Sequence, residues 1–425
     1  MAKTPKTLTF GCRLNSFESE IITDLAKKAD LGDVLIVNSC AVTGEAVRQT
    51  RQAIRKARRE NPDRKIIVTG CAAQTEGRTF GDMAEVDLVI GNDDKLRADT
   101  YLQMSLDKSL NDKVQVNDIM SVRETASHMI EGMDGRTRAF VQVQNGCDHR
   151  CTFCIIPFGR GPSRSVPMGA VVEQVKKLVG NDYREIVLTG VDTTSYGSDL
   201  PGTQTLGKLV QQILRHVPDL QRLRISSIDS IEADEALFES MAEKRLMPHL
   251  HLSLQSGDDM ILKRMKRRHL RADSEEFVAK ARSIRPDMVF GADIIAGFPT
   301  ETEEMFENSL SMIKELNLIY THIFPYSKRE GTPAARIPDQ VEKSVAKRRA
   351  ALLRAAGEKQ LDEHRKNLIG TIQQILLEKS DLGRTEQFLP VNIEDKNAMA
   401  GEIVSVKISG VTTKGLVGQL VRNAA

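Results

Sequence analysis

Three cysteines, Cys147, Cys151 and Cys154, stand close together in the stretch VQNGCDHRCTFCIIPFGRGPSRS, at the spacing C-x3-C-x2-C. Thiolates this near in sequence are typical metal ligands. A structural zinc site is closed by four ligands, so three cysteines leave one position unfilled. His149 could complete a Cys3His zinc site, although its place between two of the cysteines would strain the short loop. The alternative is a four-iron cluster that keeps one iron free for a small molecule, since simple ferredoxins use four thiolates.

A second set of three cysteines is spread through the N-terminal part of the chain. Cys12, Cys40 and Cys71 each end a short β-rich run, and these runs read KTLTFGC, DVLIVNSC and KIIVTGC. Helical patterns separate the runs, and this alternation predicts a parallel sheet. Parallel strands end at one edge of the sheet, where open α/β folds bind ligands. We therefore expect the three thiols to converge, and three ordinary buried cysteines at strand ends are the alternative.

Length and composition limit the class of protein. A chain of 425 residues is too long for one ordinary core and implies two or three domains. The formal net charge of +2 gives no overall sign of a nucleic-acid partner, so any basic surface must be local. No apolar run approaches the length of a membrane-spanning helix, and the N-terminus turns polar too early for a secretory signal. We expect a cytoplasmic protein whose reduced cysteines serve as ligands.

The elements that position the cysteines follow from the remaining apolar runs. Six strand–helix repeats predict an open parallel barrel, related to the eight-fold barrel but shorter. A charged helix and a small all-β barrel of about five strands come next. The expected fold class is therefore α/β. The predicted divisions are an α/β unit at 1–106, a linker at 107–136, the barrel at 137–340, a connecting helix at 341–370 and the small β-barrel at 371–425.

Polar and glycine residues follow the predicted barrel strands, at the end where such barrels carry their chemistry. Gly190 and Asp192 follow EIVLT, Ser226 and Ser227 follow RLRI, and Gln255 ends HLHLSLQ. Any one of them is more often a turn residue than a ligand-binding group. Together, at one mouth, they indicate a pocket.

The C-x3-C-x2-C spacing, with Phe153 before its last cysteine, resembles the radical S-adenosylmethionine (SAM) enzymes. With the second set of cysteines and the C-terminal β-domain, the chain resembles the methylthiotransferases of that superfamily over nearly its whole length. The C-terminal domain is similar to the family's TRAM domain, the N-terminal unit to its Rossmann-like domain and the barrel to its TIM-like core. The matching stretches are GCRLNSFESE, VNSCAVT, VTGCAAQ, NGCDHRCTFCIIPFGRGPSRS, LTGVD, RISSID and GADIIAGFPTET.

The resemblance implies two 4Fe-4S clusters with one open iron each. Their ligands are Cys12, Cys40 and Cys71, the auxiliary trio, and Cys147, Cys151 and Cys154, the radical trio. One SAM supplies a methyl group and another a radical that removes hydrogen from an unactivated carbon. Such a carbon has no useful acidity, so no catalytic side chain is expected. The residues implied to bind SAM are Phe153, Gly190, Asp192, Ser226, Ser227, Gln255, Ile295 and Phe324.

Short sequence motifs around the cysteines indicate the branch of the family. GCRLN, NSCAVT and IIPFGRGPSRS resemble the branch that methylthiolates C2 of N6-threonylcarbamoyladenosine at position 37 of tRNA. One alternative is the same chemistry on isopentenyladenosine in tRNA or on an aspartate of a ribosomal protein. Another is an iron–sulfur or zinc RNA-binding protein without catalysis. Arg160 and Arg164, just after the radical trio, are predicted to contact the modified base or its phosphates.

The partners implied by the resemblance are the tRNA and a low-potential electron donor of the flavodoxin or ferredoxin type. No membrane partner is expected, and the chain is predicted to be a monomer. Two basic stretches, RQTRQAIRKARREN and LKRMKRRHLR, could hold tRNA phosphates or could be solvated helix faces.

Overall fold

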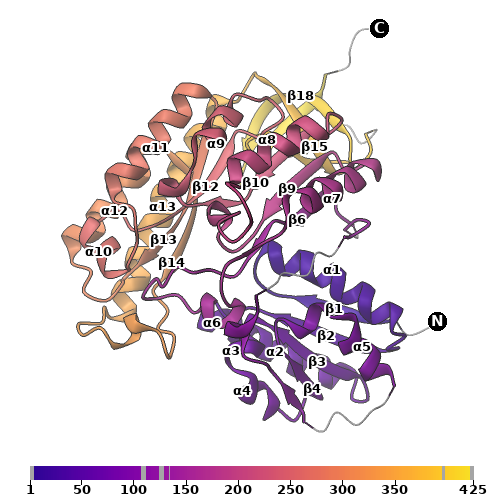
Figure 1. The fold of residues 1–425 in the computed structure, drawn as a ribbon. Helices are drawn as coiled ribbons and strands as arrows, with labels where there is room; N and C mark the ends of the chain where they lie inside the picture. Colours follow the sequence, from indigo (N-terminus) through magenta and orange to yellow (C-terminus); the bar gives the residue numbers. More distant parts are fainter. Residues whose placement is uncertain (1–3, 107–111, 124–128, 134, 395–397, 422–425) are drawn as a thin grey trace.

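The computed structural model describes residues 4–106, 112–123, 129–133, 135–394 and 398–421. These residues form an N-terminal α/β unit, an open parallel barrel and a small closed β-barrel (Figure 1). The small barrel, in yellow, lies at the top of this view, and the N-terminal unit, in indigo and purple, lies below it. Within the described ranges every helix is too short or too polar to cross a lipid bilayer.

The N-terminal unit is a five-stranded parallel sheet whose strand order follows the chain from β1 to β5. Its elements are β1 (Lys6–Thr9), α1 (Arg13–Lys28), β2 (Val34–Ser39), α2 (Gly44–Glu60), β3 (Lys65–Gly70), α3 (Cys71–Thr75), α4 (Gly77–Gly81), β4 (Leu88–Ile90), η1 (Asp94–Leu96), α5 (Ala98–Ser105) and β5 (Val114–Gln115). Side chains alternate across a strand, so Ile36 joins the apolar cluster of α1 while Leu35 and Val37 join that of α2. Burial on both faces explains why these strands read as continuous apolar runs.

The predicted linker at 107–136 continues this sheet for part of its length. β5 pairs in parallel with β4 through Val114 and Gln115, and a short 3-10 helix, η2 (Ile119–Ser121), follows. The strand content expected of the linker is therefore present. The prediction for 107–111 and 124–128 falls outside the described residues.

The barrel contains the six predicted strand–helix repeats. Its elements are β6 (Arg138–Gln142), β7 (Gln144–Asn145), α6 (Ile156–Arg160), β8 (Arg164–Ser165), α7 (Met168–Gly180), β9 (Glu185–Thr189), η3 (Thr193–Ser195), α8 (Leu206–His216), β10 (Arg222–Ile225), β11 (Ser227–Ile228), η4 (Ser230–Glu232), α9 (Glu235–Met241), β12 (His249–Gln255), α10 (Asp259–Arg264), α11 (Arg271–Ile284), β13 (Val289–Ala296), α12 (Glu303–Glu315), β14 (Leu318–Pro325) and η5 (Pro333–Arg336). The parallel orders β6-β9-β10 and β11-β12-β13-β14 are joined by a bridge between Leu223 and Leu246. The order ends at β6 and β14, so the barrel is open, as predicted.

Alternation along the strands separates the barrel's two faces. On β13, Phe290 packs against Phe277 of the surrounding helix α11, and Ala292 and Ile294 belong to the same large apolar cluster. The intervening residues Asp293 and Ile295 therefore face the barrel interior. Polar residues on this inner face are available to the chemistry at the barrel mouth.

A long helix leads to the small barrel. These elements are α13 (Lys343–Asn367), β15 (Ile372–Lys379), β16 (Leu382–Arg384), β17 (Pro390–Ile393), β18 (Ile403–Thr412) and β19 (Gly415–Leu420). The five strands close in the order β15-β16-β17-β19-β18 around a core that includes Leu377, Val391 and Leu416. The predictions of a connecting helix and a five-stranded all-β barrel are both confirmed.

The small barrel covers the N-terminal end of the open barrel. Phe388, in the loop between β16 and β17, adopts a φ of 75° and directs its ring toward the barrel. The guanidinium carbons of Arg138 and Arg224 lie 5.0 and 4.8 Å from its ring centroid, and both residues come from the starts of barrel strands. Arg222 donates to the carbonyl of Gln374 at 2.9 Å. The small barrel therefore packs against this end of the open barrel, which we call the floor, and the opposite end is the mouth.

Candidate active site

The auxiliary trio lies at one edge of the N-terminal sheet, because each cysteine directly follows a strand. Gly11 has a φ of +94°, and a Cβ there would lie 2.9 Å from the Cys40 sulfur, so only glycine lets the first strand end this close. Burial, and then the neighbouring Cys71, raise the pKa of Cys40 to about 11. The structure thus brings together the three thiols that the sequence placed at strand ends.

Asn92, which follows β4, adds a fourth strand end to this edge. Its side-chain amide donates to the Cys71 sulfur at 3.5 Å and to the carbonyl of Gly159 in α6. The amide therefore ties the auxiliary trio to the loop that carries the radical trio. Nothing in the sequence marked Asn92, since its partner in α6 is 67 residues away along the chain.

Arg160 forms a buried charge network between the N-terminal unit and the barrel. It donates to Glu18 at 2.8 Å, to Asn145 at 3.0 Å and to Asn15. Lys95 donates to the same Glu18 at 2.7 Å. Burial would raise the pKa of Glu18, but Arg160 and Lys95 lower it to about 2. The network holds one carboxylate between two cations.

The two arginines predicted to contact substrate both form hydrogen bonds within the protein. Arg160 and Arg164 are 3% and 5% exposed. Arg164 donates to the carbonyls of Pro162 at 2.8 Å and Arg160 at 3.0 Å. The structure gives both guanidiniums protein partners in place of the expected base or phosphates, and contact with substrate stays a prediction.

The radical trio lies on the loop after β7, at the barrel mouth. The Cys154 amide donates to the Cys151 carbonyl at 3.1 Å, and Arg267 donates to the Cys151 sulfur at 3.6 Å. Burial raises the pKa of Cys147 well above its usual range and that of Cys154 to about 12. A metal centre bound here would have to displace the protons of these thiols, because the thiolate is the form that ligates.

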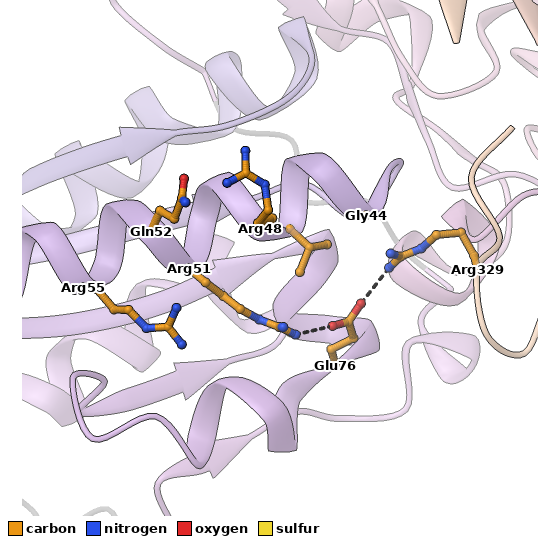
Figure 2. Close-up of a pocket in the computed structure, with 8 residues that line it drawn as sticks. Gly44, Arg48, Arg51, Gln52, Arg55, Glu76 and Arg329 are labelled. Atoms are coloured by element: carbon orange, nitrogen blue, oxygen red, sulfur yellow. Dashed lines mark hydrogen bonds and ion pairs between the residues drawn. The ribbon is translucent and has the colours of Figure 1, made fainter. Parts of the chain in front are cut away.

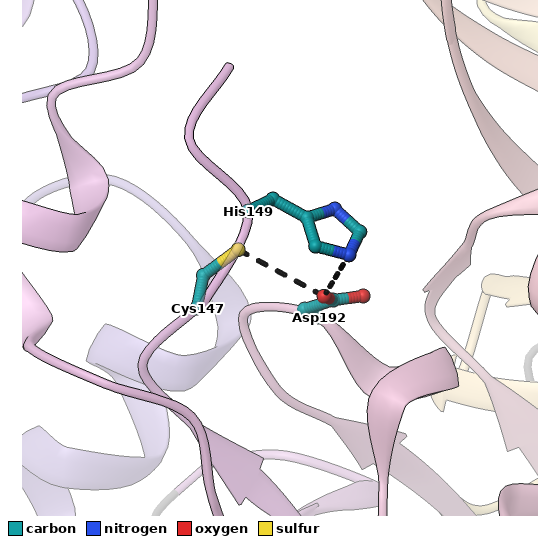
Figure 3. A group of neighbouring side chains, drawn as sticks. All are labelled: Cys147, His149 and Asp192. Carbon is teal, nitrogen blue, oxygen red and sulfur yellow. Dashed lines mark hydrogen bonds and ion pairs between the residues drawn. The ribbon is translucent and has the colours of Figure 1, made fainter. Parts of the chain in front are cut away.

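The zinc alternative can be tested on His149. Figure 3 shows the His149 ring directed at Asp192, beside Cys147, and these three ligand atoms lie within 4.8 Å of one another. The His149 ring also pairs with Glu232 at 3.2 Å. Among the described residues no such group combines His149 with all three thiols, so the Cys3His set is not assembled.

In neither trio do the three sulfur atoms lie as close together as the ligands of a single metal ion. Thiolates on a single zinc would lie about 4 Å apart, whereas within the described ranges neither trio forms a group whose sulfurs all lie within 4.8 Å. Wider spacing around a shared centre suits a cluster of several irons. The three-thiol donor sets therefore fit two iron–sulfur clusters.

The residues implied to bind SAM gather at the barrel mouth. Asp192 accepts from the Cys147 thiol at 3.8 Å, and Phe153 shares an apolar cluster with Ile295. The others lie at or just after the C-terminal ends of the barrel strands, namely Gly190, Ser226, Ser227, Gln255 and Phe324. The structure brings these residues to one end of the barrel, and their contact with SAM stays a prediction.

Two polar layers inside the barrel escaped the sequence analysis. In the upper layer, Asp293 lies 3.0 Å from His251 and 3.2 Å from His322. Burial would raise the pKa of Asp293, but the hydrogen bonds from the two histidines hold it well below its usual range. In the lower layer, Arg13 and His249 lie near Phe388. The alternation in HLHLSLQ carried a signal for the histidines, since alternate residues of a barrel strand face inward.

The first basic stretch lines a pocket between α2 and the loop after β14 (Figure 2). Its cavity is about 330 Å³, and Glu76 joins Arg51 at 2.8 Å to Arg329 at 2.6 Å. Arg48 and Arg55 also line it. One arginine of the second stretch is not available to RNA, because the Arg267 side chain is buried in an ion pair with Asp229. The first stretch lines an open pocket, and Lys263, Lys266 and Arg268 of the second stretch stay exposed.

Comparison with known proteins extends these observations. Residues 141–313 match the radical SAM superfamily, and residues 6–91 match the uncharacterized protein family UPF0004. The threonylcarbamoyladenosine tRNA methylthiotransferase MtaB of Rickettsia prowazekii (strain Madrid E) is 55% identical over 405 residues, covering 95% of this chain and 94% of the relative. MtaB of Bacillus subtilis (strain 168) is 34% identical over 435 residues, with coverage of 97% and 95%.

A relative from another branch is also similar. The tRNA-2-methylthio-N(6)-dimethylallyladenosine synthase of Hydrogenovibrio crunogenus (strain DSM 25203 / XCL-2) is 31% identical over 444 residues, covering 97% of this chain and 93% of the relative. Among solved structures, the radical SAM methyltransferase TsrM from Kitasatospora setae, with cobalamin and a [4Fe-4S] cluster bound, has a TM-score of 0.57 at 14% identity, over 79% of this chain and 77% of that one. This likeness shows the fold alone.

Proposed function

We propose that this chain, which belongs to the MtaB family of radical SAM methylthiotransferases, methylthiolates C2 of N6-threonylcarbamoyladenosine at position 37 of tRNA. The observation that carries the proposal is the pair of thiol trios, each at a strand-end edge and tied together through Asn92 and α6. A nucleoside at the barrel mouth would lie between two metal centres. The nucleoside is the one named for the MtaB relatives, threonylcarbamoyladenosine.

The cofactors of the family fit the residues present. When bound, two four-iron clusters and SAM supply the radical and the methylthio group. The auxiliary and radical trios would hold the clusters, and each trio leaves one position without a thiolate. The chain's own residues position these centres and carry no acid or base step, because the target C–H bond has no useful acidity.

Two buried arginines lie next to the cysteine thiols. Arg267 is anchored on Asp229 at 2.6 Å and directs a second N–H at Cys151. Arg160, held by Glu18, contributes a positive charge near Cys71 and Cys12. Cations in these places would offset the negative charge of thiolates bound to a metal centre. Their burial also keeps water from the centres.

Purified, cluster-loaded enzyme tests the division of roles. Cys147→Ala should abolish both SAM cleavage and methylthiolation, because it removes a ligand of the radical cluster. Cys40→Ala should retain SAM cleavage and lose methylthiolation, because only the sulfur-delivering centre is damaged. Equal loss of SAM cleavage in both variants would contradict the assignment. The unmodified parent RNA, the isopentenyladenosine RNA and the threonylcarbamoyladenosine RNA, offered in parallel, identify the substrate.

The remaining expectations about partners form part of the proposal. The donor is a low-potential protein of the flavodoxin or ferredoxin type, since radical formation needs one electron for each SAM cleaved. The enzyme acts as a monomer in the cytoplasm, where its tRNA is found. A turnover assay with candidate donors and a sedimentation measurement test the donor and the monomeric state directly.

A further inference from the structure

Arg13 directly follows Cys12 of the auxiliary trio, and its side chain lies at the barrel floor. Its guanidinium carbon is 5.6 Å from the ring centroid of Phe388. Within the described part of the chain, no carboxylate forms an ion pair with Arg13 and no hydrogen bond holds its guanidinium. The Arg13 residue is partly buried, and a guanidinium that has lost part of its water without gaining a counter-ion is unfavourable. The floor therefore carries a cation that the protein itself does not neutralise.

The surrounding charges increase this excess. Arg224 and Arg138 place two further positive charges near Arg13, and Glu185 places one negative charge there. Glu185 is already shared between Arg138 and Arg224, each at 3.0 Å. Arg13 therefore faces more positive than negative charge. Such a site attracts an anion.

Other side chains at the barrel floor carry nitrogen atoms without hydrogen-bond partners. Arg224 is fully buried, yet its Nη1 has no hydrogen-bond partner, and the same is true of Nη2 of Arg138. Both ring nitrogens of His249, which is 5% exposed, also lack partners. Buried polar groups are rarely left unpaired in native proteins, and exceptions often mark a missing ligand. The donors belong to three different barrel strands, so they converge on the interior rather than on one loop.

We propose that Arg13, with the free N–H groups of Arg138 and Arg224, binds the carboxylate of the substrate's threonylcarbamoyl group. This inference rests on the proposed function and deepens it, since it assigns the group that selects the nucleoside. Guanidinium and carboxylate form paired, charge-assisted hydrogen bonds. An isopentenyl group has no anion to offer and would leave the partly buried Arg13 cation unpaired, so the same contact disfavours it.

Short anticodon stem-loop RNAs provide the test. One carries N6-threonylcarbamoyladenosine, and the other carries the same nucleoside with its carboxylate converted to a carboxamide. Wild-type enzyme, Arg13→Gln and the control Arg215→Gln, an exposed position on α8, are compared by kcat/KM for methylthiolation. The dissociation constant of each RNA is also measured with cluster-free protein, which reports on binding without turnover.

The wild type and Arg215→Gln should favour the carboxylate RNA by about 10- to 100-fold, the value of a charge-assisted hydrogen bond. Arg13→Gln should bring the ratio of kcat/KM for the carboxylate and carboxamide RNAs close to one. Arg13→Lys should restore part of this preference, because lysine keeps the positive charge but lacks the planar pair of N–H donors of arginine. An unchanged ratio in Arg13→Gln, or no preference in the wild type, would overturn the inference. If the wild type methylthiolates neither RNA, the proposed function fails, and the binding ratio still decides the role of Arg13.

Discussion

Glu18→Gln is the change that most directly tests the buried charge network. The Glu18 side chain is fully buried between Lys95 at 2.7 Å and Arg160 at 2.8 Å. Glutamine would leave two buried cations without their carboxylate, and breaking a buried pair in this way costs about 3–5 kcal/mol. The pKa of Glu18 gives a similar value, because a fall from 4.5 to about 2 corresponds to about 3 kcal/mol at 1.36 kcal/mol per pH unit.

The pH dependence has a definite sign. The folded pKa of Glu18 lies below its unfolded value, so its contribution to stability is present above pH 4.5 and is lost as the pH falls toward 2. The difference in stability between wild type and Glu18→Gln should therefore be full at pH 7 and shrink below pH 4.5. Urea denaturation of the full chain, followed by hydrogen exchange in α1 at several pH values, measures both quantities.

Two variants make the test specific. Lys95→Met should cost less than Glu18→Gln, because Glu18 keeps its pair with Arg160. Glu45→Gln should have little effect, since the Glu45–Arg48 pair is exposed and screened by water. The reasoning fails if Glu18→Gln is as stable as the wild type, or if Lys95→Met is the more damaging of the two.

Three further predictions concern RNA binding, the small barrel and the link between the trios. Arg51→Gln combined with Arg329→Gln should weaken RNA binding and reduce its salt slope by about one to two, because each arginine lost from the pocket removes about one phosphate contact; anisotropy titrations across KCl concentrations would expose an unchanged slope. Phe388→Ala should destabilise the protein by about 3–5 kcal/mol and increase proteolysis near the small barrel, whereas wild-type resistance would show that the ring does not hold the floor. Asn92→Leu should lower the iron content at the auxiliary trio while the radical trio stays loaded, since the amide donates to the sulfur of Cys71; Mössbauer spectra showing both clusters intact would refute this role.

Much of the fold was accessible from the sequence because it depends on local patterns. Apolar runs of four to eight residues, each followed by a helical period, were enough to predict the six barrel strands. The strand-end positions of Cys12, Cys40 and Cys71 predicted their convergence, because all strands of a parallel sheet end at one edge.

The parts that escaped prediction depend on contacts between distant segments. Arg160 follows the radical trio, and its position suggested a substrate contact, yet it pairs with Glu18, which is 142 residues away. Phe388 closes the barrel floor through arginines in other domains, and its own sequence surroundings carry no sign of this. Arg13 was noted only as part of GCRLN. Its unpaired guanidinium becomes visible only when the floor beneath it is assembled.

Nucleoside mass spectrometry of tRNA from cells with and without the gene tests the central claim most directly. Loss of the 2-methylthio derivative of N6-threonylcarbamoyladenosine, with accumulation of its unmethylthiolated parent, is the predicted result. Complementation by the wild type but not by Cys40→Ala or Cys147→Ala should accompany it. An unchanged profile of this nucleoside would contradict the assignment of substrate, and loss of the isopentenyladenosine derivative in its place would identify the other tRNA branch.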